Sequence, residues 1–219
     1  MRLERGRVGP ILARWTTELL VVFIGVYGAF VVAEWDEKRE RSERVAQING
    51  ALVEEIRDIQ GNTHRVALWA PSYLAGLDSA LARGVPVAPQ PWLEPVSIQP
   101  HVWNATLTSG ALDLLSVETF LEVSEFYNLL TLGFEQIAQL RSLSETQLLP
   151  RLGDPASTFY TASGGGPALR FRPEYEWYPG TMERLGTLAR CITMKGDSAL
   201  AALGAAPDPA YGGLDAEGC

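Results

Sequence analysis

Residues 15–35 read WTTELLVVFIGVYGAFVVAEW, and this stretch decides the architecture of the chain. Its inner part, 19–33, carries no charged side chain. At a helical rise of about 1.5 Å per residue the whole stretch is about 31 Å long, which matches a bilayer hydrocarbon core of about 30 Å. Trp15 and Trp35 stand at its two ends, and indole rings favour the membrane–water interface. The stretch is therefore predicted to be a transmembrane helix.

Two other interpretations fit part of this pattern. A cleaved secretory signal also has arginines before a short apolar core, and Val31-Val32-Ala33 resembles its cleavage site. A buried core helix would be equally apolar, but it does not need tryptophan and arginine at its ends. Because these residues flank the stretch, we prefer the spanning helix to either alternative.

Charge is unevenly distributed along the chain, whose formal net charge is −8. Four arginines and two glutamates precede Leu19, whereas ten basic and nineteen acidic residues follow Arg44. Lysine and arginine are equally frequent near both ends of the span, so the orientation depends on the mostly unopposed positive charge before it. We expect a bacterial inner-membrane protein with residues 1–14 in the cytoplasm, a span over 15–35, a periplasmic domain over 36–203 and a tail over 204–219.

The chain after the span has a helical pattern. No proline occurs between Trp35 and Pro71, and the apolar residues of this stretch recur at spacings of three and four, which is one face of a helix. We expect one rod from Leu12 to near Ala70 that Pro71 ends or kinks. The apolar face consists of Val45, Ile48, Leu52, Ile56 and Ile59.

Further helices are expected over 72–83, 104–115, 117–149 and 181–203. They are connected by a proline-rich extended segment over 85–101 and by an irregular segment over 154–180, which forms a short hairpin or a strap. The predicted fold class is mainly α: one transmembrane helix continues into an extramembrane helical bundle with irregular Pro/Gly-rich connectors.

Small residues within the span indicate a surface for another helix. Gly25 and Ala29 are four residues apart and Gly28 is adjacent, so backbones could approach closely there. Tyr27 could hydrogen-bond across such a contact or tilt towards the interface. We expect these four residues to pack against a second membrane helix.

Two further features concern the domain. Cys191 and Cys219 are the two cysteines, and they either form a disulfide or remain as a buried residue and a loose thiol. The segment 170–178 interleaves aromatic and charged residues, a composition typical of protein interfaces, although a strap folded over the helices has the same composition. The candidate interface residues are Phe171, Arg172, Tyr175, Trp177 and Tyr178.

The residues that catalysis requires are scarce. His64 and His101 are the only histidines, and neither has a recognisable partner for acid–base or nucleophilic chemistry. No GxSxG, Walker A, GxGxxG or HExxH motif occurs, and the carboxylates Glu54-Glu55-Asp58 are expected on a solvated helix face. We therefore expect no enzyme, no cofactor and no bound metal.

Two stretches carry a family pattern. In the first, Glu18 precedes an apolar run with Gly25 and Ala29 that ends in Trp35-Asp36-Glu37. In the second, Trp103 is followed by Ser109-Gly110, by Leu112 and Leu114-Leu115, and by the pair Phe126-Tyr127. Both resemble an uncharacterised family of bacterial single-span membrane proteins that contain a domain of unknown function. The resemblance implies membrane anchoring and a helical domain, and it implies no activity and no catalytic residues.

These observations favour a non-enzymatic accessory or structural subunit that binds and stabilises a larger membrane complex, of respiratory or photosynthetic type for example. Its partners would be the lipid bilayer and other membrane subunits, with a homo-oligomer as a further option. Nucleic acid is not expected, because an acidic domain repels phosphate backbones. The alternative is an extracytoplasmic helical module that binds a ligand or senses a signal and acts through a partner protein.

Overall fold

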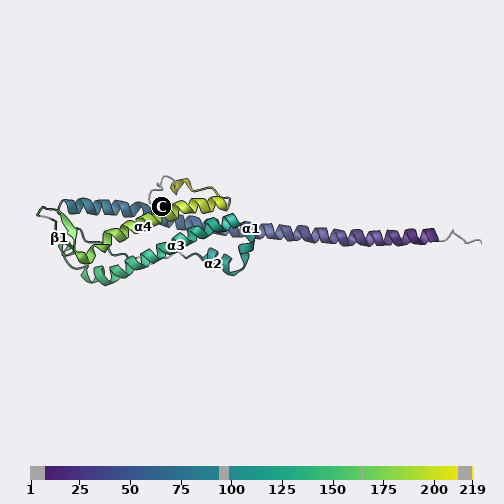
Figure 1. Ribbon diagram of the computed structural model, residues 1–219, viewed down its shortest axis with the longest axis horizontal. Coiled ribbons are helices and arrows are strands. Elements are labelled where there is room, and N and C mark those ends of the chain that lie inside the picture. The colour runs from purple at the N-terminus through teal and green to yellow at the C-terminus, as the bar shows by residue number, and fades with distance from the viewer. Residues whose placement is uncertain (1–7, 94–98, 164, 212–218) are drawn as a thin grey trace, which may run out of the picture. The chain divides into compact units, whose positions relative to one another are not determined.

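The structure is a computed structural model that describes residues 8–93, 99–163, 165–211 and 219, with side chains described at Trp15 and from Leu19 onward. It is mainly helical, which confirms the predicted fold class at that level (Figure 1). The chain divides into two compact units, Met1–Gln47 and Ile48–Cys219.

Helix α1, Val8–Ala82, is 75 residues long and contains Pro71. The prediction of a long apolar helix near the N-terminus is confirmed. Of the two outcomes predicted for Pro71, an end of the rod is wrong, because Pro71 lies inside α1. Ala70 and Pro71 pack on Gly186, where an added Cβ would lie 3.0 Å from the Ala70 Cβ and 3.5 Å from the Pro71 Cδ. This close packing stabilises the helical turn at Pro71, although proline has no backbone N–H to donate to the preceding turn. The short helix expected over 72–83 is therefore the end of α1.

The described residues of the second unit form three more helices and one hairpin. The helices are α2, His101–Thr108; α3, Val117–Leu143; and α4, Trp177–Ala202, and α3 and α4 run side by side (Figure 1). Strands β1, Tyr160–Ala162, and β2, Leu169–Phe171, form the hairpin and pair antiparallel with Tyr160 opposite Phe171. Short 3₁₀ or π turns occupy Ala111–Leu114, Ser144–Leu148, Leu149–Arg151, Ala156–Phe159, Pro173–Tyr175 and Pro209–Tyr211.

Local signals explain where these helices begin and end. The Ser116 side chain accepts a hydrogen bond from the Thr119 backbone N–H at 3.0 Å, which caps the start of α3. Gly110 has a φ of +74°, so the single helix expected over 104–115 is wrong: the left-handed residue separates α2 from a 3₁₀ turn. The expected helix over 117–149 is regular only as far as Leu143, where a π turn follows.

Two apolar clusters form the core of the second unit. In the first, Leu52, Ile56 and Ile59 from α1 are at most 1% exposed and pack with Trp103 and with residues of α3 and α4. The second cluster joins the end of α1, the end of α3, the hairpin and the start of α4. From Ile48 to Ile59, the apolar face predicted from the spacing of three and four is therefore the face of α1 that packs on the domain's other helices.

A buried polar network also connects α1 to α4. The Gln60 amide donates to the Thr193 carbonyl oxygen at 2.8 Å and to Asp197 Oδ1 at 2.9 Å. The Thr63 and Thr193 hydroxyls lie 2.9 Å apart. Gly196 makes room for the Gln60 side chain, because an added Cβ there would lie 2.5 Å from Gln60 Nε2.

We expect Gly196→Ala to lower the free energy of unfolding by about 1–3 kcal/mol, because the new methyl group overpacks the contact with Gln60. Gly50→Ala is the matched control, since a Cβ at this helical glycine meets nothing within 4 Å. That change should raise the free energy of unfolding by about 0.5–1 kcal/mol. Urea unfolding followed by circular dichroism measures both, and equal effects of the two changes would contradict the packing argument.

Candidate functional site

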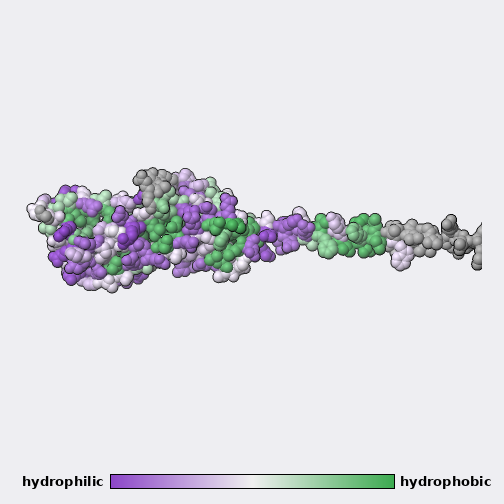
Figure 2. Space-filling view, viewed as in Figure 1, coloured by the Kyte–Doolittle hydropathy of each residue, from purple (hydrophilic) through white to green (hydrophobic). Residues whose placement is uncertain are grey.

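The apolar band of α1, residues 19–33, is exposed along its whole length. Its large hydrophobic side chains are between 48% exposed, at Val31, and 72% exposed, at Leu19 and Phe30. Figure 2 shows the band as hydrophobic on the face in view, followed along α1 by a hydrophilic stretch. Among the described residues, α1 is the one helix that is long and apolar enough to cross a membrane. Exposed apolar surface of this extent is typical of a segment that another apolar medium covers.

Exposed tryptophans and charged residues flank the band. Trp15 and Trp35 are both more than 60% exposed. The Arg39 guanidinium lies 5.7 Å from the centre of the Trp35 ring, a cation–π contact beside the predicted interface. Beyond it, pairs of opposite charge four residues apart connect Glu34 with Lys38, Arg39 with Glu43, and Glu40 with Arg44. These pairs favour helix in a stretch whose side chains are all exposed to solvent.

The small residues predicted for helix packing have open space beside them. A Cβ added at Gly25 or Gly28 would meet nothing within 4 Å. At about 100° per residue, Gly25, Gly28 and Ala29 share one face of the helix, whereas Tyr27 projects about 200° from Gly25. Tyr27 instead stacks on Phe23 with ring centres 6.3 Å apart. Tyr27 therefore does not share the face of the small residues, and its contact with a second membrane helix stays a prediction.

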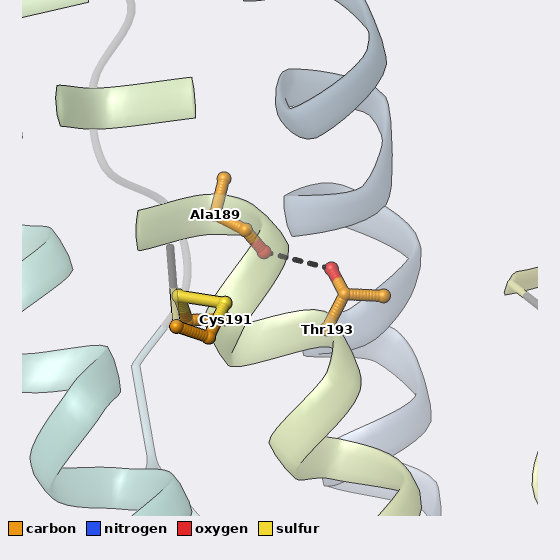
Figure 3. Close-up of a disulfide and its surroundings, with 4 residues drawn as sticks. Ala189, Cys191 and Thr193 are labelled. Carbon is orange, nitrogen blue, oxygen red and sulfur yellow. Dashed lines mark hydrogen bonds between the residues drawn. A yellow bond between two sulfur atoms is a disulfide. The ribbon is translucent and has the colours of Figure 1, made fainter. Parts of the chain in front are cut away.

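Cys191 and Cys219 form a disulfide in the structure, with Cα atoms 5.4 Å apart (Figure 3). Cys191 and Thr193 point to opposite sides of α4 in this view, and the Thr193 hydroxyl donates to the Ala189 carbonyl oxygen at 2.9 Å. The Thr193 side of α4 belongs to the buried polar network with Gln60 and Thr63. The disulfide is therefore formed on a different side of α4 from that network.

The predicted partner interface over 170–178 is wrong, because its aromatic residues belong to the protein's own core. Phe171, Tyr175 and Tyr178 are 8% exposed or less. The Trp177 indole donates to Gln147 Oε1 at 2.7 Å, and Arg172 Nε donates to the Tyr160 carbonyl oxygen at 3.2 Å. The segment folds back on the helices, so the alternative interpretation, a strap, describes it.

Tyrosine hydroxyls hold the proline-rich segment against this aromatic core. The Tyr178 hydroxyl donates to the Gln90 carbonyl oxygen at 2.9 Å and lies 3.0 Å from the Tyr73 hydroxyl. The Tyr160 hydroxyl donates to the Val87 carbonyl oxygen. Tyrosine side chains thus supply hydrogen bonds that this proline-rich segment cannot make through regular backbone pairing. Burial, and then the hydrogen bond with Tyr73, raise the pKa of Tyr178 well above its ordinary value.

We expect Tyr178→Phe to lower the free energy of unfolding by about 1–2 kcal/mol at neutral pH, because the Gln90 carbonyl oxygen loses its donor. The unfolded phenol ionises near pH 10 and the folded one ionises later, so the native protein loses this stability as pH rises above about 10. The variant lacks the phenol. Above about pH 10 the difference in free energy of unfolding between the two proteins should therefore shrink by about 1.4 kcal/mol per pH unit. Urea titrations at several pH values test this. Tyr27→Phe is the control, since the Tyr27 side chain is exposed and should have no effect on domain unfolding.

The prediction that Glu55 lies on a solvated face is wrong: it is half-buried and has a structural role. Its carboxylate accepts hydrogen bonds from the backbone N–H groups of Val102 at 2.7 Å and Trp103 at 3.2 Å, and from the Tyr127 hydroxyl. The N-cap residue of α2, Pro100, makes no side-chain capping bond, and Glu55 caps the helix from α1. Burial, and then the bond with Glu55, raise the pKa of Tyr127.

The two histidines belong to different helices, His64 to α1 and His101 to α2. His101 is exposed at the start of α2. His64 is half-buried, its ring centre lies 5.1 Å from that of Tyr211, and its buried Nδ1 has no hydrogen-bond partner. In the described ranges, no group of three or more His, Cys, Asp or Glu side chains is placed to hold a metal ion.

Comparison with known proteins finds no match among protein-family models, curated proteins or solved structures. The resemblance of the two stretches around the span and around Trp103 to a single-span family therefore remains a prediction from their residues.

Proposed function

We propose that the protein is a non-enzymatic, single-pass membrane subunit that binds and stabilises a larger membrane protein complex. The apolar band of α1 is the observation that carries the proposal. None of its large hydrophobic side chains is buried by the chain's own residues, so lipid and a neighbouring membrane helix are the media that can cover it. In this proposal the band spans the bacterial inner membrane and the helical domain is a periplasmic bundle.

The disulfide supports that orientation. Disulfides persist in the periplasm and are rare in the cytoplasm, where thiol reductants keep cysteines reduced. Cys191 belongs to α4 of the second unit, so that unit would lie on the oxidising side. Orientation can be measured directly by digesting intact spheroplasts with a protease: the proposal expects loss of the domain, and a protected domain contradicts it.

The face made by Gly25, Gly28 and Ala29 is the proposed contact with a partner helix. Membrane helices associate through close backbone packing, which small residues allow. A Cβ at either glycine meets nothing within this chain. A larger side chain there can therefore disturb an intermolecular contact without disturbing the protein's own packing.

Native purification in mild detergent tests the proposal. The wild-type chain is expected to co-purify with other membrane subunits in fixed ratio, and Gly25→Leu with Gly28→Leu should abolish this. Phe23→Trp is the matched control, because it also enlarges a side chain of the band, and Phe23 lies about 160° from Gly25, on the opposite face. A wild-type chain that elutes alone as a monomer would contradict the proposal and favour the sensing module.

A further inference from the structure

The segment after α4 folds back over α1. Gly204 has a φ of +78°, a left-handed conformation that ends α4 and turns the chain. Tyr211 then reaches α1, where its hydroxyl oxygen would lie 2.9 Å from a Cβ built on Gly61 and its ring packs on His64. Arg57 Nη2 donates to the Ala206 carbonyl oxygen at 3.4 Å. We call residues 204–211 the cover.

The noncovalent contacts of the cover are weak. None of its residues is buried, and only Ala205, Asp208 and Tyr211 are half-buried. The hydrogen bond from Arg57 is long, and Ala205, which packs on the first core cluster as a partly buried residue, is the one residue of the cover that contacts a cluster. Little apolar surface therefore offsets the conformational entropy that the cover loses on docking.

The disulfide between Cys191 and Cys219 supplies the missing constraint. The bond joins Cys191 of α4 to Cys219, 28 residues further along the chain, and so keeps the cover near α4 and α1. It does not connect the two core clusters to each other, because neither cysteine is a member of either. Opening the bond should therefore free the cover and leave the core folded.

We propose that the cover is a redox-released lid over the surface of α1 that contains Arg57, Gly61 and His64. The reductant is a protein dithiol. One of its thiolates attacks a sulfur of the Cys191–Cys219 bond, that bond breaks, and the second cysteine leaves as a thiolate that takes up a proton. The other thiolate of the reductant then attacks the mixed disulfide, so both cysteines end as thiols and the dithiol ends as its own disulfide.

Release of the cover changes what solvent and partners can reach. The His64 imidazole loses the Tyr211 ring that packs on it, and its buried Nδ1 becomes accessible. Gly61 has no side chain, so the uncovered helix surface allows close backbone approach. The redox state of the two cysteines would thus decide whether this surface is open.

Chemical labelling of the two histidines tests the proposal on the full-length protein in detergent. Diethyl pyrocarbonate is added before and after complete reduction with dithiothreitol, and labelling is located by mass spectrometry. His101 is the internal reference, because it is exposed whatever the state of the cover. Reduction should raise labelling of His64 severalfold, leave His101 unchanged and leave the helical circular dichroism unchanged.

Three variants complete the test. Cys191→Ser with Cys219→Ser should reproduce the reduced protein without reductant, and Tyr211→Ala should raise His64 labelling with the disulfide intact. Asp208→Asn keeps the side-chain oxygen that accepts from the Ala210 N–H and should have no effect. The proposal is overturned if His64 stays protected after full reduction, if Tyr211→Ala leaves it protected, or if reduction removes the helical signal. The last result would show that the helical domain needs the disulfide to stay folded.

Discussion

Replacing both Ile24 and Val26 with lysine is expected to remove the protein from the membrane fraction. Both residues lie in the apolar band, and each is more than half exposed. Lysine at the centre of a membrane helix costs about 3 kcal/mol in insertion, whereas isoleucine and valine favour insertion by about 0.5 kcal/mol each. The double change therefore costs about 7 kcal/mol, which exceeds what the remaining band can offset.

Carbonate washing of the membranes followed by ultracentrifugation measures this effect. The wild-type chain should stay in the pellet, and the double-lysine chain should appear in the supernatant or be degraded. Ile24→Leu with Val26→Leu keeps the band apolar and should behave like the wild type. If the double-lysine protein remains in the washed pellet, the apolar band is not what anchors the chain.

Glu55→Ala should lower the free energy of unfolding by about 2–4 kcal/mol, the second large effect. The change leaves the Val102 and Trp103 backbone N–H groups and the Tyr127 hydroxyl without their common acceptor. It also leaves the first turn of α2 uncapped, and Trp103 stacks on Tyr127 at 5.0 Å within the same contact. Losing these hydrogen bonds should therefore also destabilise the first core cluster, to which Trp103 and Tyr127 belong.

Urea unfolding provides the measurement, and the neighbouring residue provides the control. Glu54 is exposed, so Glu54→Ala should change the free energy of unfolding by no more than about 0.5 kcal/mol. Glu55→Gln keeps one acceptor oxygen and should give an intermediate loss. In a double-mutant cycle, Glu55→Ala and Tyr127→Phe should lose less together than the sum of their separate losses, because they remove the same bond. Full additivity would show that the bond contributes nothing.

Features with a local cause could be read from the sequence. The apolar band follows from fifteen consecutive uncharged residues, and the buried face of α1 follows from apolar spacings of three and four. The hydroxyl that caps α3 and the left-handed glycine that ends α4 act within a few residues of themselves. Each of these signals depends on the chain's own helical geometry and needs no distant partner.

Features that depend on distant partners were decided only by the tertiary structure. Pro71 stays within α1 because Gly186 allows close packing, and Glu55 caps a helix whose first amides lie 47 residues further along the chain. The aromatic residues of 170–178 carry the same composition whether they face a partner or the core, and their burial follows from the packing of the hairpin and α4 against α1. Periodicity and capping act over one turn of helix, whereas a hydrogen bond such as that from Gln60 to Asp197 joins residues 137 apart. Folding alone brings such residues together, so the long apolar helix was readable from the sequence and the contacts inside the domain were not.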